Sequence, residues 1–476
     1  MKFAFACVFA FCLSCGGSEE EETATAATDD NATSGGEQTA ARIEAPPGSQ
    51  GPTEEWDEDS DTAQTTPPAQ SPPQTQQQIA DQLFGAPDAQ SGTPLPPRRP
   101  MNGSASSSYR QGVAASTSGD DATARSAFER ALDADPNAYQ AAYNLGVLAQ
   151  RQGQDNRAID YYRRALRIQA DYELAAEGIV TIHLRRGSAP DAIAFIQPLA
   201  QRYERNLHLQ ALFAEALVQA GRPDEAEAAA RRALRRDERF VPAMIAMIKA
   251  SLRRGRNELA QSILTQALAV DDSNAELHYL KGRVFLAQDG RLGDAINEFR
   301  RAVQLRPDYL EARMALGSQL LTGANYQEAL TNFQAASTLA PNSVSVLLGL
   351  GNGYRATKQW QLAKQSFDAA LRAQADLPQA HFNLGLMYMS SAGEFPGLDT
   401  VAGLQRAQQE LTTYRSMMGP RLPRDDQSTA YLEDLGRQIE REQRRIERER
   451  AQKLREAERA ARQSVRTASA DGGTGG

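Results

Sequence analysis

The chain has 476 residues, of which 24% are charged, 41% hydrophobic and 7% aromatic, and its formal net charge is −8. The charge is unevenly placed, because residues 16–104 contain 16 acidic and 3 basic side chains and so carry −13, while Lys2 adds +1 and residues 105–476 carry +4. Nucleic-acid-binding proteins need a basic stripe that displaces counterions. We therefore predict no nucleic-acid partner.

The first 15 residues contain all three cysteines, Cys7, Cys12 and Cys15. The apolar run 3–13 is too short to span a bilayer as a helix and fits the hydrophobic region of a secretory signal. The sequence from Leu13 to Gly16 resembles a bacterial lipobox, although Cys12 stands where that motif usually has leucine. The resemblance implies a lipoprotein signal peptide at 1–15, acylation of Cys15 and anchoring in the outer membrane of a Gram-negative bacterium, facing the periplasm. The alternative is an ordinary signal peptide that is cleaved nearby.

Residues 16–104 form an acidic tract that is rich in Pro, Gln, Ser and Thr. Such a composition cannot bury enough apolar surface to fold, so we predict a disordered tether. Two apolar islands interrupt the tract, namely Trp56 within the acidic residues 54–59 and a second island at 79–84. Each island is either a short docking motif or residual hydrophobicity in a linker.

The chain repeats itself from residue 105 with a period of 34 residues, apart from one interval of 35. The predicted units start at residues 105, 139, 173, 207, 241, 275, 310, 344 and 378. Six units have glycine at their eighth position: Gly112, Gly146, Gly282, Gly317, Gly351 and Gly385. Most of these units also carry an aromatic residue about half a unit later: Phe128, Tyr162, Phe299, Phe333 and Phe367. Small residues let two backbones approach closely, and bulky residues fill the remaining space.

Each unit has the pattern of two antiparallel helices joined at a Gly-rich or Asp-rich turn such as residues 151–155. One unit cannot bury its apolar face alone, so the units must stack. We predict an all-α solenoid of about nine helix-turn-helix units at 105–418. The pattern resembles the tetratricopeptide repeat, and Tyr143-Asn144-Leu145-Gly146 is especially close to the first-helix motif of that family. Pro198 falls inside the second helix of the third unit and predicts a local bend.

The resemblance to tetratricopeptide repeats implies that the first helices line a concave face, with their fifth and ninth positions pointing inward. The candidate protein-binding groove so implied contains Tyr109, Tyr143, Lys249, Tyr279, Arg283 and Phe382. Its natural ligand is an extended peptide or a helix from another envelope protein. For each tyrosine, the alternative is simple packing between neighbouring repeats.

A charged helix is predicted at 419–466, with one long helical segment from residue 428 to 466. Its Glu and Lys or Arg residues are spaced four apart, which favours stabilising ion pairs. Its apolar seam is thin and broken, so the helix is either solvated or a weak coiled-coil or docking helix. The Gly-rich residues 467–476 are predicted to be a disordered tail.

The sequence shows no motif that indicates catalysis. We find no phosphate-binding G-x-x-x-x-G-K-[ST], no H-E-x-x-H and no G-x-S-x-G. The four histidines fall in different repeats without the spacing of metal ligands. We therefore predict that the protein is not an enzyme and needs no cofactor and no metal.

The combination of lipobox, acidic tether and repeats, including residues 139–150, resembles the tetratricopeptide repeat lipoproteins of the myxobacterial gliding machinery. This resemblance implies a non-catalytic scaffold in an envelope-spanning machine, anchored in the outer membrane and serving gliding motility. Two alternatives remain. The protein could be an assembly factor or pilotin for a secretin or another outer-membrane protein, or a regulatory subunit that docks onto a cell-wall enzyme.

Overall fold

The structure is a computed structural model that describes residues 95–288 and 290–471. Within these ranges the chain forms α-helices and one short 3-10 helix, Gly419–Arg421, and no strand. The predicted all-α solenoid is therefore confirmed. The signal-peptide prediction, including Cys15, and most of the tether prediction lie outside the described residues.

The first helices of the nine units are α2 (Gly103–Thr117), α4 (Tyr139–Arg151), α6 (Glu173–Arg185), α8 (Leu207–Gln219), α10 (Val241–Arg253), α12 (Ala275–Leu286), α14 (Leu310–Thr322), α16 (Val344–Ala356) and α18 (Pro378–Ser390). The second helices are α3 (Asp121–Ala134), α5 (Asp155–Ile168), α7 (Ala189–Arg202), α9 (Pro223–Leu234), α11 (Asn257–Val270), α13 (Leu292–Leu305), α15 (Tyr326–Leu339), α17 (Trp360–Ala373) and α19 (Thr400–Met418). From α4 onward, every first helix begins at the residue that the repeat spacing indicates. Helix α2 begins at Gly103, two residues before the predicted boundary.

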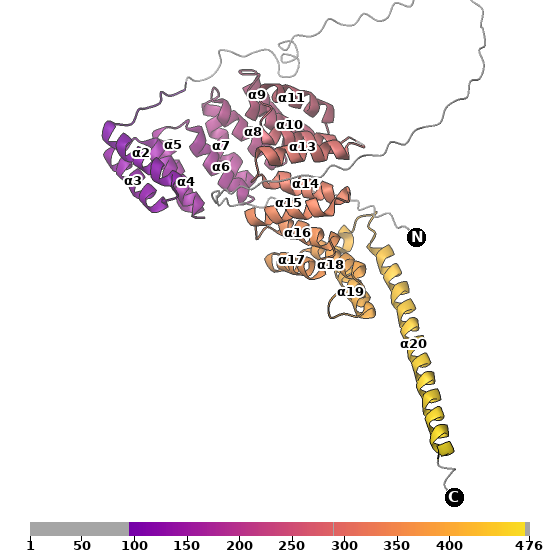
Figure 1. The fold of residues 1–476 in the computed structure, drawn as a ribbon. Coiled ribbons are helices and arrows are strands. Elements are labelled where there is room, and N and C mark those ends of the chain that lie inside the picture. The colour runs from indigo at the N-terminus through magenta and orange to yellow at the C-terminus, as the bar shows by residue number, and fades with distance from the viewer. Residues whose placement is uncertain (1–94, 289, 472–476) are drawn as a thin grey trace, which may run out of the picture.

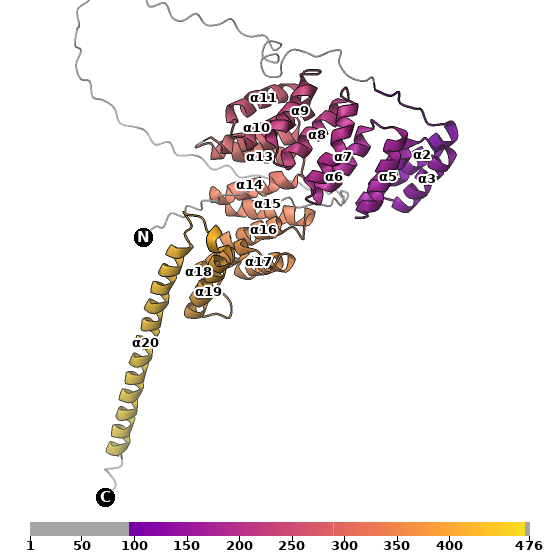
Figure 2. The same cartoon turned by 180° about the vertical axis from the view of Figure 1, so that it is seen from behind.

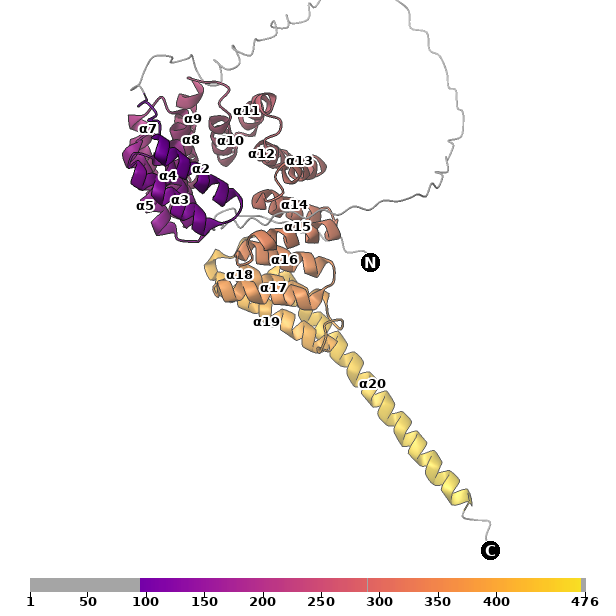
Figure 3. The same cartoon turned by 60° about the vertical axis from the view of Figure 1, so that its left-hand side comes forward.

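The helices stack in chain order into a curved array (Figures 1 and 2). Most successive first helices contact one another, as α8 does with α10 and α10 with α12, whereas successive second helices make no comparable contact in the described chain. The shorter spacing of the first helices places them on the inside of the curve. In Figure 3, α2 to α13 form an arc beside which α14 to α19 continue the array.

Close backbone approach holds the helices of a unit together. A Cβ atom added to Gly146 would lie 2.5 Å from Cε1 of Tyr162, and one added to Gly178 of the next unit would lie 2.5 Å from Cε2 of the same ring. The Tyr162 ring is therefore sandwiched between two successive first helices, and Tyr162 is only 2% exposed. Phe333 faces Gly317 in the same manner, at 2.8 Å from a Cβ added there.

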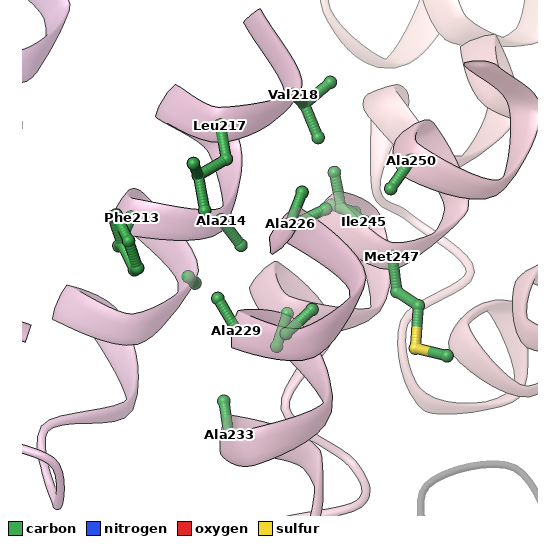
Figure 4. Close-up of a cluster of buried hydrophobic side chains, with 14 of the residues drawn as sticks. Phe213, Ala214, Leu217, Val218, Ala226, Ala229, Ala233, Ile245, Met247 and Ala250 are labelled. Carbon is green, nitrogen blue, oxygen red and sulfur yellow. The ribbon is translucent and has the colours of Figure 1, made fainter. Parts of the chain in front are cut away.

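The fourth unit reaches the same close packing with alanines in place of the pair of glycine and aromatic ring. Figure 4 shows Ala214 of α8 beside Ala226, Ala229 and Ala233 of α9, and all four are fully buried. Leu217 from α8 completes this part of the core. In this unit alanines on both helices allow the close approach that a glycine and an aromatic ring, such as Gly146 and Tyr162, provide in other units.

The turns between the two helices of a unit require a left-handed backbone. Gly153 has φ 67° at this position in the second unit, and glycine occupies the equivalent position in most units. Ala324 and Lys358 hold the same position in the seventh and eighth units with φ 58° and 59°. Because a Cβ atom disfavours this region, these two turns carry a conformational cost that the glycine turns avoid.

Helix α7 continues through Pro198 to Arg202, so the proline does not end the helix. The last helix, α20 (Ser428–Asp471), packs its first turns against α19 through Leu435, which is fully buried, and Ile439. Its remainder projects away from the array (Figures 1 to 3). It extends five residues beyond the predicted end at 466 and so includes half of the predicted tail. Among the described helices, none is long and apolar enough to cross a membrane.

Candidate functional site

A cluster of tyrosines lies at the N-terminal end of the concave face. The Tyr143 ring lies 5.7 Å from that of Tyr162 and 5.5 Å edge-on from that of Tyr172. Asn144 Nδ2 donates a hydrogen bond of 3.1 Å to the hydroxyl of Tyr109 on the preceding first helix. Tyr109 and Tyr143 are both half-buried. They pack between repeats and also present part of their surface to the groove.

Burial raises the pKa values of two side chains at this end of the groove, Tyr143 and Glu177. It raises the pKa of the Tyr143 hydroxyl, and the carboxylate of Glu177 adds to the effect. The hydroxyl therefore stays protonated at neutral pH and can donate as well as accept a hydrogen bond. Burial likewise raises the pKa of Glu177, which lies on the next first helix.

Lys249 joins three successive first helices at the centre of the concave face. Its Nζ donates to Glu215 Oε1 on α8 at 2.9 Å and lies 2.7 Å from Glu276 Oε1 on α12. Burial alone would lower the pKa of Lys249, but the two carboxylates outweigh it and raise that pKa above its usual range. Burial would raise the pKa of Glu215, but the charge of Lys249 outweighs it and holds that pKa below its usual range. The triad carries a net charge of −1 and ties α8, α10 and α12 together.

Tyr279 and Arg283 lie side by side on α12, one turn apart. The Tyr279 ring lies 5.8 Å from that of Phe299 and 5.4 Å from that of Tyr309, the residue immediately before α14. Burial raises the pKa of Tyr279, while the charge of Arg283 and a hydrogen bond from it act in the opposite direction. The pair therefore presents a tyrosine edge and a guanidinium beside the Lys249 triad.

Phe382 lies at the C-terminal end of the array, where it packs against α19 and α20. Its ring lies 5.0 Å from that of Tyr414 on α19 and 6.3 Å from that of Tyr431 on α20. The first turns of α20 thus cover the end of the groove in which Phe382 was predicted to bind a ligand. Tyr109, Tyr143, Tyr279 and Arg283, the other candidate groove residues apart from Lys249, lie outside this covered end and are partly exposed.

The sequence pattern selects Lys249 as a groove residue, but it does not predict that Glu215 and Glu276 both pair with this lysine. Glu215 occupies a ninth position and Lys249 the ninth position of the next unit, so these two were adjacent in the pattern. Glu276 occupies the second position of its helix, which the fifth-and-ninth pattern does not include. A rule that pairs each ninth position with the second position of the following unit would have found this contact.

The described residues provide no evident site for a metal. No group of three or more His, Cys, Asp or Glu side chains gathers in a way that could hold an ion in that part of the chain. His278 pairs with Glu298 through Nδ1 at 2.7 Å, and His381 pairs with Glu410 at 2.8 Å. These two contacts link the first and second helices of their own units.

Parts of the chain match a known family of repeat proteins. The family model described as "tetratricopeptide repeat" matches residues 109–173, 245–309, 287–344 and 314–378. A search of curated protein sequences gave no match.

Three solved structures are among those to which this chain is similar. A tetratricopeptide repeat protein from Parabacteroides merdae is 16% identical, with a TM-score of 0.44 over 53% of this chain and 99% of that one. A thermophilic repeat protein from Thermus thermophilus is 25% identical, with a TM-score of 0.35 over 39% of this chain and all of that one. The Cut9–Hcn1 complex of the APC/C is 16% identical, with a TM-score of 0.41 over 70% of this chain and 76% of that one.

Proposed function

We propose that this chain, whose residues 109–173 and 245–378 match the tetratricopeptide repeat model, is a non-catalytic repeat scaffold that binds other proteins in its concave groove. The observation that carries the proposal is the row of partly exposed side chains on consecutive first helices. Tyr109 and Tyr143 begin the row, the Lys249 triad continues it, and Tyr279 and Arg283 follow. Tyrosine and arginine are the residue types that supply most of the energy at protein interfaces.

The shape and chemistry of the groove favour an extended segment or a helix of a partner protein as ligand. The N-terminal end offers aromatic edges and the exposed Val113. The centre is polar, because Lys249 lies between two glutamates and Arg283 stands beside them. A ligand segment with apolar anchors toward one end and amide or other hydrogen-bonding groups toward the other would complement this arrangement.

Site-specific photo-crosslinking in cells tests the groove. A photo-reactive phenylalanine derivative replaces Tyr143 or Tyr279 on the concave face, or Tyr326 as the matched control. Tyr326 is 42% exposed and begins the second helix α15, on the outside of the curve. We expect adducts with a partner protein from Tyr143 and Tyr279 but not from Tyr326. Adducts from Tyr326 alone, or the same adducts from all three positions, would contradict the proposal.

We further propose that the scaffold is tethered to the outer membrane through an acylated Cys15. The support is the apolar run 3–13 followed by the lipobox-like residues around Cys15. Mass spectrometry of the mature N-terminus tests the proposal, and a diacylated or triacylated Cys15 is expected. An unmodified Cys15, or a mature chain that begins elsewhere, would refute it. The variant Cys15→Ser should release the protein from the membrane fraction.

For the machine that the scaffold serves, we propose an envelope-spanning assembly that drives gliding motility. Deletion of the gene should abolish surface movement while the multimers of secretins and the muropeptide profile stay unchanged. Loss of a secretin multimer would instead favour an assembly factor or pilotin. Co-purification with a cell-wall enzyme, together with altered muropeptides, would favour a regulatory subunit. Either result would replace the motility proposal and leave the groove intact.

A further inference from the structure

A shallow hollow lies between α5 and α7, the second helices of the second and third units. Figure 1 shows these two helices as neighbours in the array. The volume of the hollow is about 350 Å³, and it is lined by Arg163, Leu166, Arg167, Phe195, Pro198 and Leu199. It lies on the side of the helices opposite to the concave groove. A ligand in the hollow would therefore leave the groove open.

The floor of the hollow is apolar. Leu166 and Phe195 are partly buried and pack against the cores of the second unit and of the units that follow, so they are held in place from below. Pro198 and Leu199 replace the small or polar residues that other second helices carry at this level. The floor therefore offers an apolar surface against which one aromatic side chain can pack.

The rim of the hollow is basic. Arg163 and Arg167 are both exposed and stand one turn apart on α5. Within residues 95–288 and 290–464, neither forms an ion pair. Other arginines on second helices do have such partners, as Arg300 does with Glu328 at 3.0 Å. The hollow thus combines an apolar floor with two guanidinium groups that can receive carboxylates.

The described part of the chain begins beside the C-terminal end of α5, the helix that carries the two rim arginines. The carbonyl oxygen of Pro96 accepts a hydrogen bond of 3.4 Å from Nε2 of Gln169, which lies two residues after Arg167. Arg98 holds this segment in place through an ion pair of 2.6 Å with Glu173. The described chain thus begins within a few residues of the basic rim, and the acidic tract precedes it in the sequence.

We propose that residues 54–59 of this same chain bind in the hollow, with Trp56 on the apolar floor and the flanking carboxylates against Arg163 and Arg167. Five of these six residues are acidic and the sixth is the tryptophan, which matches a hollow with a basic rim and an apolar floor. The other apolar island, residues 79–84, has Asp81 as its single acid and complements the rim poorly. Extended chain spans roughly 3.3 Å per residue, so the residues between Trp56 and Leu95 reach the hollow easily.

Tryptophan fluorescence tests this interaction because the chain has two tryptophans. Trp360 is buried in the core, and its conservative replacement Trp360→Phe leaves Trp56 as the single emitter in the full-length chain. We expect the emission of Trp56 to be blue-shifted, and its quenching by acrylamide to be weaker, than in a free peptide of residues 50–62. The double variant Arg163→Glu/Arg167→Glu should restore the values of the free peptide.

Two controls make the fluorescence result specific. The double variant Arg301→Glu/Arg372→Glu makes the same change of charge at exposed positions on other second helices, and Phe84→Ala alters the other apolar island. Both should leave the emission of Trp56 unchanged. Peptide-like emission in the unaltered chain, or an emission that responds to the control arginines as it does to Arg163 and Arg167, would overturn the proposal.

Competition between the segment and an added peptide provides a second readout. A tethered segment acts at an effective concentration near the millimolar range, so a labelled peptide of residues 50–62 should bind the full-length Trp56→Ala variant roughly tenfold more tightly, or better, than the unaltered chain. Equal affinities would show that the hollow is open in the chain and that its occupant is another protein. No binding to either chain would show that the hollow does not recognise this sequence. Both outcomes contradict the proposal.

Discussion

Gly146 is the position at which a single methyl group should damage the stacking of the repeats most directly. In the variant Gly146→Ala, the new Cβ would lie 2.5 Å from Cε1, 2.6 Å from Cδ1 and 3.1 Å from Cζ of Tyr162. The ring cannot move away, because Gly178 of the next unit closes its other side. The hydroxyl of Tyr162 is also held by a hydrogen bond of 2.7 Å to Gln150. The helices of the second unit must therefore separate.

The expected loss of stability follows from two opposing effects. Inserting a methyl group into a well-packed core costs about 1–3 kcal/mol, and a ring confined on both faces belongs at the upper end of that range. Replacing glycine with alanine inside a helix returns about 1 kcal/mol. We therefore expect Gly146→Ala to destabilise the second unit by about 2 kcal/mol.

Hydrogen exchange followed by mass spectrometry measures this effect locally, which matters because repeat arrays need not unfold in a single step. A loss of about 2 kcal/mol corresponds to roughly 30-fold faster exchange in α4 and α5. Gly436→Ala in α20 is the matched control, because no atom lies within 4 Å of the added Cβ. It should leave exchange in α4 and α5 unchanged and slow the exchange of α20.

A second substitution tests the physical cause. Tyr162→Leu in the Gly146→Ala background removes the ring that the new methyl group meets, and the fifth unit shows that Ile248 and Leu264 can occupy these two positions. The two substitutions should therefore cost less together than the sum of their separate costs. Unchanged protection of α4 and α5 in Gly146→Ala, or strictly additive effects in the double variant, would refute the close-approach argument.

Three further predictions concern the turns and the Lys249 triad. Ala324→Gly should stabilise the seventh unit by about 0.5–1 kcal/mol in chemical denaturation, because relief of the left-handed backbone outweighs the added entropy of the unfolded chain. Lys249→Met should destabilise the central units by about 2 kcal/mol, because it leaves the carboxylates of Glu215 and Glu276 facing each other without a cation. The partial exposure of the triad keeps the loss from being larger. Unchanged hydrogen exchange in α8 to α12 would contradict this prediction. Ionised Glu215 has a lowered pKa, so its stabilising effect is present above pH 4.5, its ordinary value, and is lost as the pH falls below it. The difference in stability between the protein and Glu215→Gln should therefore be constant near neutral pH and vanish in acid.

The periodicity of small and bulky residues was sufficient to predict the helix pairs and their order. The reason is physical, since each contact between Gly146 and Tyr162, or between Gly317 and Phe333, joins residues a fixed distance apart in the chain. Departures from the pattern were also informative, because Ala214 compensates for the missing large residue by packing against other alanines.

Contacts between distant parts of the chain were not predictable in the same manner. Tyr431 of α20 packs near Phe382 only because α20 turns back toward the array after residues 419–427, and the angle of that turn is not encoded by the repeat. The ion pair between Arg98 and Glu173 joins the predicted tether to the third unit, and no repeat position encodes it. The pairing of Lys249 with two glutamates depends on the distances between α8, α10 and α12 on the concave face. Those distances follow from the curvature of the whole array, so the sequence of one unit does not predict them.

The central claim is that this protein binds its partner on the inside of the curve formed by the first helices. The most direct test is a hydrogen-exchange comparison of the full-length chain with and without the partner recovered by crosslinking. We predict that the partner slows exchange in α4, α6, α8, α10 and α12 and leaves α5, α7, α9 and α11 unchanged. Protection confined to the second helices, or to α20 alone, would contradict the account.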